Sequence, residues 1–145
     1  MIAYPALPVL ALALAALLFK STLLSAAQVV SRARARTFLV PEDARLMRTT
    51  VTDREAPFVV RCGAVWRNDL ENIPFFLIAA LTFALLGGAA DAAAWWFGAF
   101  VAVRYLHTAI YLRGLQPART VAYLTGLALT WGVVISSLAL AARAL

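Results

Sequence analysis

The 145-residue sequence has few charged residues, a single cysteine and a single histidine. Charged residues make up 14% of the chain, whereas soluble domains carry about 25%. The lone Cys62 excludes an intrachain disulfide framework, and we interpret it as a small packing residue rather than a nucleophile. With one histidine and no carboxylate pair at ligand spacing, no metal site is expected. The sequence also contains no Ser-His-Asp arrangement and no phosphate-binding loop.

Apolar residues dominate the chain instead. They make up 63% of it, against about 45–50% in soluble domains, and the mean hydropathy is +0.83. These values predict an integral membrane protein that forms one compact unit over residues 1–145. The net charge of +6 lies within apolar segments and one short loop, so we expect no nucleic-acid partner. The heavy use of Ala and Arg suggests a GC-rich bacterial genome and therefore the bacterial inner membrane.

The hydrophobic pattern predicts an all-α fold, an integral membrane four-helix bundle. Each apolar segment is long enough to span a bilayer, and the predicted helices cover residues 4–30, 59–86, 92–112 and 117–142. A polar connection precedes the second helix, and Pro41-Glu42-Asp43-Ala44 predicts a short helix within it. Pro74 is expected to kink the second helix.

Charge in the connections predicts the orientation in the membrane. The connection 31–61 carries seven Arg and the turn after the third helix carries Arg113, whereas the turn between them carries Asp91. The positive-inside rule therefore assigns the first and third connections to the cytoplasm and both termini to the opposite side. The polar halves of the last three helices then lie together in the cytoplasmic half of the membrane.

Polar side chains within the first two helices need partners, because charge in a spanning helix costs about 2.5–3.5 kcal/mol per residue. Lys20 must reach the membrane surface or face a partner. Arg67 and Glu71 are four residues apart and share one helix face with Asn68. Asp69 points elsewhere, and we interpret it as a structural residue that pairs, for example, with a loop Arg. The alternative for Arg67 and Glu71 is a purely structural ion pair.

The third and fourth predicted helices each carry a polar stripe. Arg104, His107, Thr108 and Tyr111 recur at helical spacing on the third, and Arg119, Thr120 and Tyr123 open the fourth. Arg forks bind carboxylates and Glu71 could take an ammonium group, so the set suits a small zwitterionic or multiply carboxylated ligand. Single residues also have structural interpretations: a satisfied interhelical His107, packing tyrosines, Asp43 as a helix cap and Arg32 in a lipid-facing charge belt.

These motifs resemble those of the MAPEG family, the membrane-associated proteins of eicosanoid and glutathione metabolism, and most closely its prostaglandin E synthase branch. The resemblance is carried by Arg61-Cys62, Arg67-Asn68-Asp69-Leu70-Glu71-Asn72-Ile73-Pro74, Pro41-Glu42-Asp43-Ala44, Arg104-x-x-His107-Thr108-x-x-Tyr111-Leu112 and Pro117-x-Arg119-Thr120-x-x-Tyr123. It spans nearly the whole chain. Thr120 stands where the branch has Ser, and Gln116 and Ala64 stand at positions that are basic there.

The resemblance implies a homotrimer that binds glutathione between adjacent subunits on the cytoplasmic side. It implies cofactor binding by Arg32, Arg67, Asn68, Glu71, His107, Tyr111, Arg119 and Tyr123, and catalytic roles for Arg119, Thr120 and Asp43. It assigns Arg67, Asn68 and Glu71 to one subunit, and the residues of the last two helices to its neighbour. Arg104 matches a structural or site-lining residue.

The implied chemistry is the activation of the glutathione sulfur. A free thiol has a pKa of about 8.5, and a nearby guanidinium favours the nucleophilic thiolate. The expected function is glutathione transfer to lipophilic electrophiles from the bilayer, or reduction or isomerisation of lipid peroxides. The alternatives are a dedicated prostaglandin E synthase and a non-enzymatic membrane ligand-binding protein.

Overall fold

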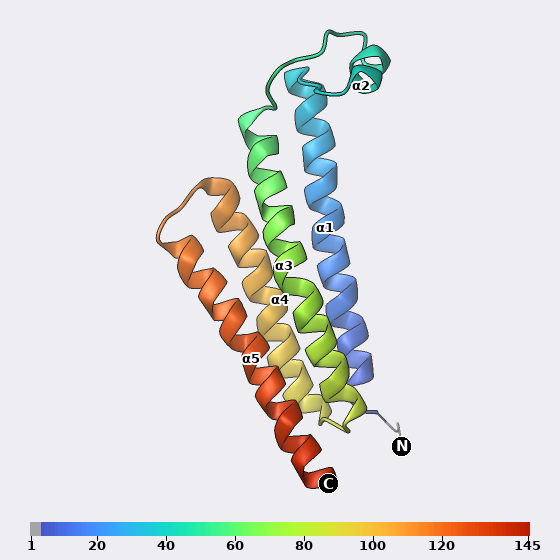
Figure 1. The fold of residues 1–145 in the computed structure, drawn as a ribbon, viewed down its shortest axis with the longest axis vertical. Coiled ribbons are helices and arrows are strands. Elements are labelled where there is room, and N and C mark those ends of the chain that lie inside the picture. The colour runs from blue at the N-terminus through green and yellow to red at the C-terminus, as the bar shows by residue number, and fades with distance from the viewer. Residues whose placement is uncertain (1–3) are drawn as a thin grey trace.

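The computed structural model describes residues 4–145, and within them every regular element is a helix. The helices are α1 (Leu7–Ala35), α2 (Pro41–Leu46), α3 (Pro57–Leu85), α4 (Ala90–Arg113) and α5 (Ala118–Ala144), as Figure 1 shows. The prediction of an all-α fold is confirmed, and a short helix, α2, lies in the first connection where Pro41-Glu42-Asp43-Ala44 predicted it. The first predicted boundary is wrong at its end, because α1 continues through the Arg-rich residues to Ala35. Ala and Arg are among the best helix formers, so charge does not end the helix there.

Prolines and left-handed residues mark the ends of the helices. Pro41 and Pro57 begin α2 and α3, where the missing backbone N–H has no intrahelical partner to lose. α1 ends at Arg36 (φ 51°) and α4 ends at Gly114 (φ 71°), both in the left-handed conformation that commonly terminates helices. Pro74 lies inside α3, which continues past it as one helix.

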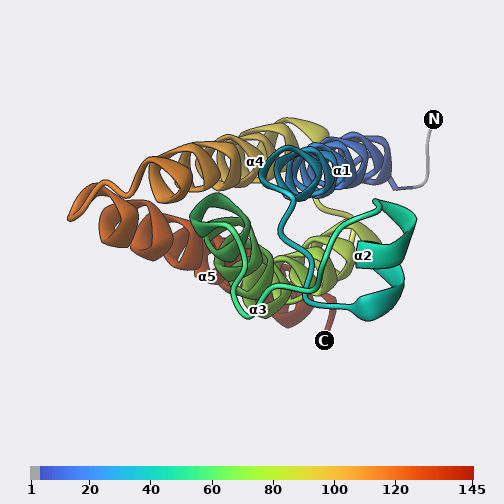
Figure 2. The same ribbon diagram turned by 90° about the horizontal axis from the view of Figure 1, so that it is seen from above.

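The four long helices pack side by side (Figures 1 and 2). α3 and α4 form the centre, since each contacts the other and both contact α1 and α5. Their interface is aromatic in the half nearer the termini, where Phe76 stacks on Phe100 with ring centroids 3.7 Å apart and Phe97 meets Phe76 and Phe83 edge to face. Cys62 is buried beside Leu24 and Val65, in agreement with a packing role.

The outer surface of the bundle is apolar. Large apolar side chains such as Leu18, Phe75 and Leu138 are more than half exposed. Three helices, α1, α3 and α5, are long and apolar enough to cross a membrane. α4 is not among them, because Arg104 and His107 lower its hydropathy, yet these side chains face inward and are buried. The chain is therefore a membrane protein that buries Lys20, Asp69, Arg104 and His107 inside its bundle.

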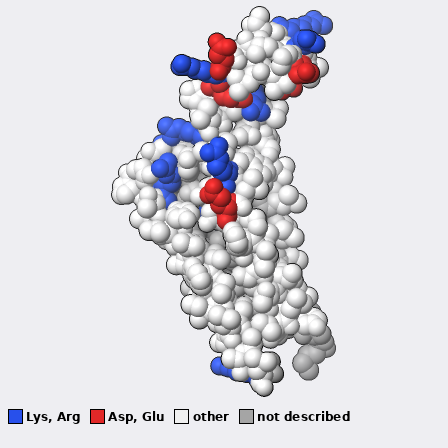
Figure 3. All heavy atoms as spheres, viewed as in Figure 1, with Lys and Arg blue, Asp and Glu red and all other residues white. Residues whose placement is uncertain are grey.

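Both termini and the turn between α3 and α4 lie at one end of the bundle (Figure 1). The first connection, with α2, lies at the other end, and the turn between α4 and α5 points the same way. Charged side chains gather in that half, while the opposite half of the face in Figure 3 is almost free of them.

Candidate functional site

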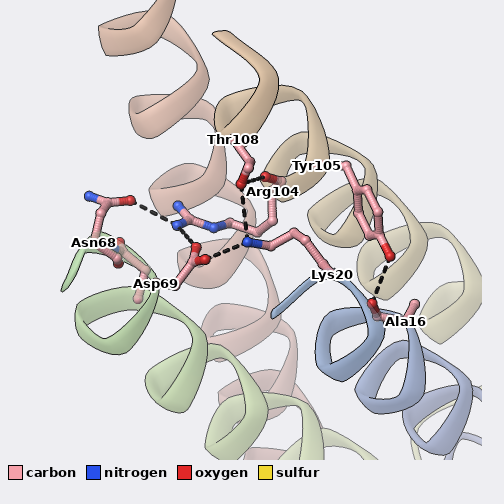
Figure 4. A network of polar contacts seen from close by, with 8 residues as sticks. Ala16, Lys20, Asn68, Asp69, Arg104, Tyr105 and Thr108 are labelled. Carbon is pink, nitrogen blue, oxygen red and sulfur yellow. Dashed lines mark hydrogen bonds and ion pairs between the residues drawn. The ribbon is translucent and has the colours of Figure 1, made fainter. Parts of the chain in front are cut away.

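A buried ionic cluster joins α1, α3 and α4 (Figure 4). Lys20 of α1 and Arg104 of α4 both pair with the Asp69 carboxylate of α3. Lys20 Nζ also donates to Thr108 Oγ1 at 3.1 Å, and Arg104 Nη2 donates to Asn68 Oδ1 at 2.8 Å. The structural role predicted for Asp69 is confirmed, but its partners are Lys20 and Arg104 of other helices rather than a loop Arg. Two cations buried in the bundle need a counter-charge more than an exposed loop cation does.

This cluster leaves two buried nitrogen atoms without a partner. Among the described residues, Arg104 Nε and His107 Nδ1 are buried and make no hydrogen bond. The interpretation of His107 as a satisfied interhelical histidine is therefore wrong. An unsatisfied buried polar group costs about 1–3 kcal/mol, so a ligand or a water molecule that reached these atoms would be bound favourably.

Aromatic contacts connect His107 to Arg119 across the interface between α4 and α5. The rings of His107 and Tyr111 meet at 65°, with centroids 5.7 Å apart. The Arg119 guanidinium carbon lies 4.7 Å from the centroid of the Tyr111 ring, a cation–π contact. Three of the predicted site residues are thus brought together within one protomer.

Gln116, which precedes α5, is the polar neighbour of Arg119 and Thr120. Guanidinium nitrogens only donate hydrogen bonds, so the amide oxygen of Gln116 must face Arg119. In that orientation it accepts from Arg119 Nη2 at 2.6 Å and from Nε at 3.0 Å, and the amide nitrogen donates to Thr120 Oγ1 at 3.3 Å. Sequence analysis did not identify Gln116 as a site residue, although its spacing to Arg119 and Thr120 is that of helix neighbours.

Arg67 and Glu71 are both exposed on α3. Neither takes part in an ion pair among the described residues, although their spacing would allow one. The structural alternative of an Arg67–Glu71 pair is therefore wrong. Asn68, between them, is held by Arg104.

A groove of about 640 Å³ runs between α3 and α5. Its lining is mostly apolar, with Phe75, Leu127 and Trp131 among its residues. Glu71 and Tyr123 lie on the same groove, so two residues that the resemblance assigns to adjacent subunits line one surface of a single protomer. An apolar groove that ends at polar side chains suits a lipophilic molecule with a polar end.

Two predicted site residues lie apart from the others. Arg32 is paired with Glu55 of the first connection through Nη2 at 2.7 Å and Nε at 2.9 Å. Asp43 is exposed on α2, which contacts neither α4 nor α5, so one protomer does not bring Asp43 to Arg119. Sequence analysis missed Glu55 as the partner of Arg32, because residues far apart in a loop and a helix show no periodic signal.

Comparisons with known proteins agree with this geometry. A model of the MAPEG family matches residues 10–139. Prostaglandin E synthase of Macaca fascicularis is 34% identical over 120 residues, which cover 82% of this chain and 79% of that protein. The enzymes of that name from Bos taurus (118 residues; 81% and 77%) and Homo sapiens (120 residues; 82% and 79%) are also 34% identical. These matches favour an enzyme over a non-enzymatic scaffold. The chain therefore belongs to the MAPEG family and is a membrane enzyme of the transferase or isomerase type.

Proposed function

We propose that this protein binds glutathione at the polar half of the bundle and uses Arg119 to stabilise the glutathione thiolate. The observation that carries the proposal is the state of Arg119, which no carboxylate neutralises among the described residues. Its charge is held only by an aromatic face and a neutral amide. A guanidinium in that state retains its field for an anionic sulfur.

The cofactor would be held by groups of both signs. Exposed Arg67 and Glu71 offer a cation for a glutathione carboxylate and an acid for its ammonium group. Asn68 presents an amide that Arg104 orients. His107, Tyr111 and Tyr123 would line the remainder of the site, and Thr120 would donate a hydrogen bond to the sulfur.

The second substrate would be lipophilic and enter from the bilayer. The apolar groove between α3 and α5 supports this, because it ends at Glu71 and Tyr123. With an aryl halide, a carbon–sulfur bond forms and the halide leaves with the bonding electrons. With a lipid hydroperoxide, sulfur attacks a peroxide oxygen, the O–O bond breaks, and a second glutathione converts the oxidised sulfur to the disulfide. The relatives named prostaglandin E synthase favour isomerisation of prostaglandin H2 as the second candidate reaction.

We also propose that the enzyme is a homotrimer, spans the membrane four times and has its site on the cytoplasmic side. Support for assembly comes from Asp43 and Arg32, which lie away from Arg119 within one protomer and would have to approach it from a neighbour. Support for the orientation comes from the basic residues of the first connection and of the turn after α4. A bacterial inner membrane would fit the Ala- and Arg-rich composition.

Loss of Arg119 tests the proposal. We expect Arg119→Ala to lower kcat/KM for glutathione transfer about 100- to 1000-fold, because it removes the charge that stabilises the developing anion. Arg143→Ala, an exposed Arg on the same helix, is the matched control and should behave as wild type. Purified protein would be assayed with an aryl halide, a lipid hydroperoxide and prostaglandin H2. Full activity of Arg119→Ala with every substrate would refute the thiolate role.

A further inference from the structure

The threonines within the described helices follow one pattern, and Thr120 departs from it. Thr22, Thr82, Thr108, Thr125 and Thr130 each donate the hydroxyl proton to the backbone carbonyl four residues earlier. Threonine hydroxyls in helices commonly donate to the backbone carbonyl four residues earlier. Thr120 lies in the first turn of α5, so the residue four positions earlier, Gln116, precedes the helix; among the described residues its hydroxyl makes no such bond and instead meets the side chain of Gln116.

The orientation of the Gln116 amide decides which partner donates. Because the amide oxygen accepts from Arg119 Nη2 and Nε, the amide nitrogen is the atom that lies 3.3 Å from Thr120 Oγ1. The nitrogen can only donate, so the threonine oxygen accepts and its single proton remains available. One neutral side chain thus acts on both predicted catalytic residues of α5.

We propose that Gln116 is a positioning residue that holds the Arg119 guanidinium in place and turns the Thr120 hydroxyl so that its proton points to the glutathione sulfur. This inference rests on the proposed function. Arg119 is then fixed on two sides, by the face of Tyr111 and by the amide oxygen along its Nε–Nη2 edge. The other edge of the Arg119 guanidinium remains free to bind a ligand. Its N–H donors are therefore oriented before the glutathione thiolate forms.

The neutral charge of Gln116 is part of its role. A carboxylate at this position would accept from Arg119 equally well, but it would neutralise the guanidinium and repel a thiolate. It could not donate to Thr120 either. An apolar side chain of the same length would leave both residues free to adopt other rotamers. Replacing Gln116 by Met and by Glu, which have similar sizes, therefore separates the effect of its hydrogen bonds from the effect of its neutral charge.

The test uses the full-length protein in lipid nanodiscs. Gln116→Met removes all three hydrogen bonds, to Arg119 and to Thr120, at nearly constant length, and Gln116→Glu retains the acceptor but adds charge. Gln28→Met on α1 is the matched control, since the Gln28 side chain makes no hydrogen bond among the described residues, and Gln116 itself is exposed. For each protein, the thiolate absorbance of bound glutathione is titrated with pH, and kcat, KM and glutathione affinity are measured.

We expect Gln116→Met to raise the pKa of the bound thiol by about one unit and to lower kcat by up to about tenfold at pH values below that pKa, where the thiolate fraction falls tenfold for each unit of pKa. Glutathione affinity should change less than about threefold, because the carboxylate and ammonium contacts persist. Gln116→Glu should raise this pKa further. A Gln116→Met profile that coincides with that of wild type would overturn the inference alone. Absence of any thiolate signal in wild type would overturn the proposed function and the inference with it.

Discussion

Asp69 carries the negative charge that the two buried cations beside it require. Lys20 and Arg104 approach it from two other helices, and Thr108 and Asn68 supply further hydrogen bonds (Figure 4). Such a cluster is costly to bury and costlier to break, because removal of one partner leaves charges without compensation. Its position next to Asn68 also determines how that proposed cofactor ligand is presented.

We expect Asp69→Asn to lower the free energy of unfolding by about 3–5 kcal/mol, since Lys20 and Arg104 would share no carboxylate. The measurement is denaturant unfolding of the purified protein in detergent micelles. Asp53→Asn is the control, because Asp53 is exposed in the first connection and forms no ion pair among the described residues. Equal stability of the Asp69→Asn and Asp53→Asn proteins would show that the cluster contributes nothing to folding.

The packing of α5 on α4 determines where Arg119 lies relative to Tyr111. Gly132 is the point of close approach, since a Cβ atom there would come within 2.4 Å of the Trp96 ring. Gly98 on α4 has no atom within 4 Å of such a Cβ and so faces open space. Small residues permit close helix contact in membrane proteins, and Gly132 serves that purpose here.

We expect Gly132→Ala to lower the melting temperature, because the added methyl group must displace the Trp96 ring at a cost of about 1–3 kcal/mol. Gly98→Ala should be neutral or stabilising, since Ala favours the helix by about 1 kcal/mol and meets no neighbour. Thermal unfolding followed by circular dichroism compares the two proteins directly. A melting temperature of Gly132→Ala at or above that of Gly98→Ala would contradict the close approach of α4 and α5.

Over the whole bundle, polar and apolar side chains are divided between two halves. Charged side chains gather where the first connection and the turn after α4 lie, and the termini lie at the opposite end (Figures 1 and 3). Both features follow from one cause, because a bilayer excludes charge from its core and the positive-inside rule favours basic loops on one side.

The orientation predicts which loops a membrane-impermeant maleimide can reach. In a Cys62→Ala background, we expect Asp91→Cys to react in intact cells and Thr50→Cys to react only after the membrane is opened. Both positions are exposed: Asp91 lies in the first turn of α4, next to the turn between α3 and α4, and Thr50 lies in the first connection. Labelling is read by a mass shift on a gel. The reverse pattern would mean that the polar half faces away from the cytoplasm.

Local features of the sequence predicted the helices well and the partners of single charges poorly. The short helix after Pro41 and the inward stripe of α4 follow from spacing and composition alone. The charge pattern predicts a loop from residue 31, but α1 continues to Ala35, because Arg favours helices. The partners of Asp69 and Arg32 come from segments far away in the sequence and leave no periodic trace, whereas the partners of Gln116 lie at helical spacing but depend on the rotamer of its amide.

Composition and periodicity were sufficient to establish a helical membrane protein with its charges gathered in one half, since bilayer physics constrains every span in the same way. Which charges meet depended on the three-dimensional packing of the helices. Lys20, Asp69 and Arg104 are far apart in the chain, and only the rotation of α1, α3 and α4 about their axes directs them to one point. The same holds for Arg119, whose contact with Tyr111 exists because α5 packs against α4 in one register.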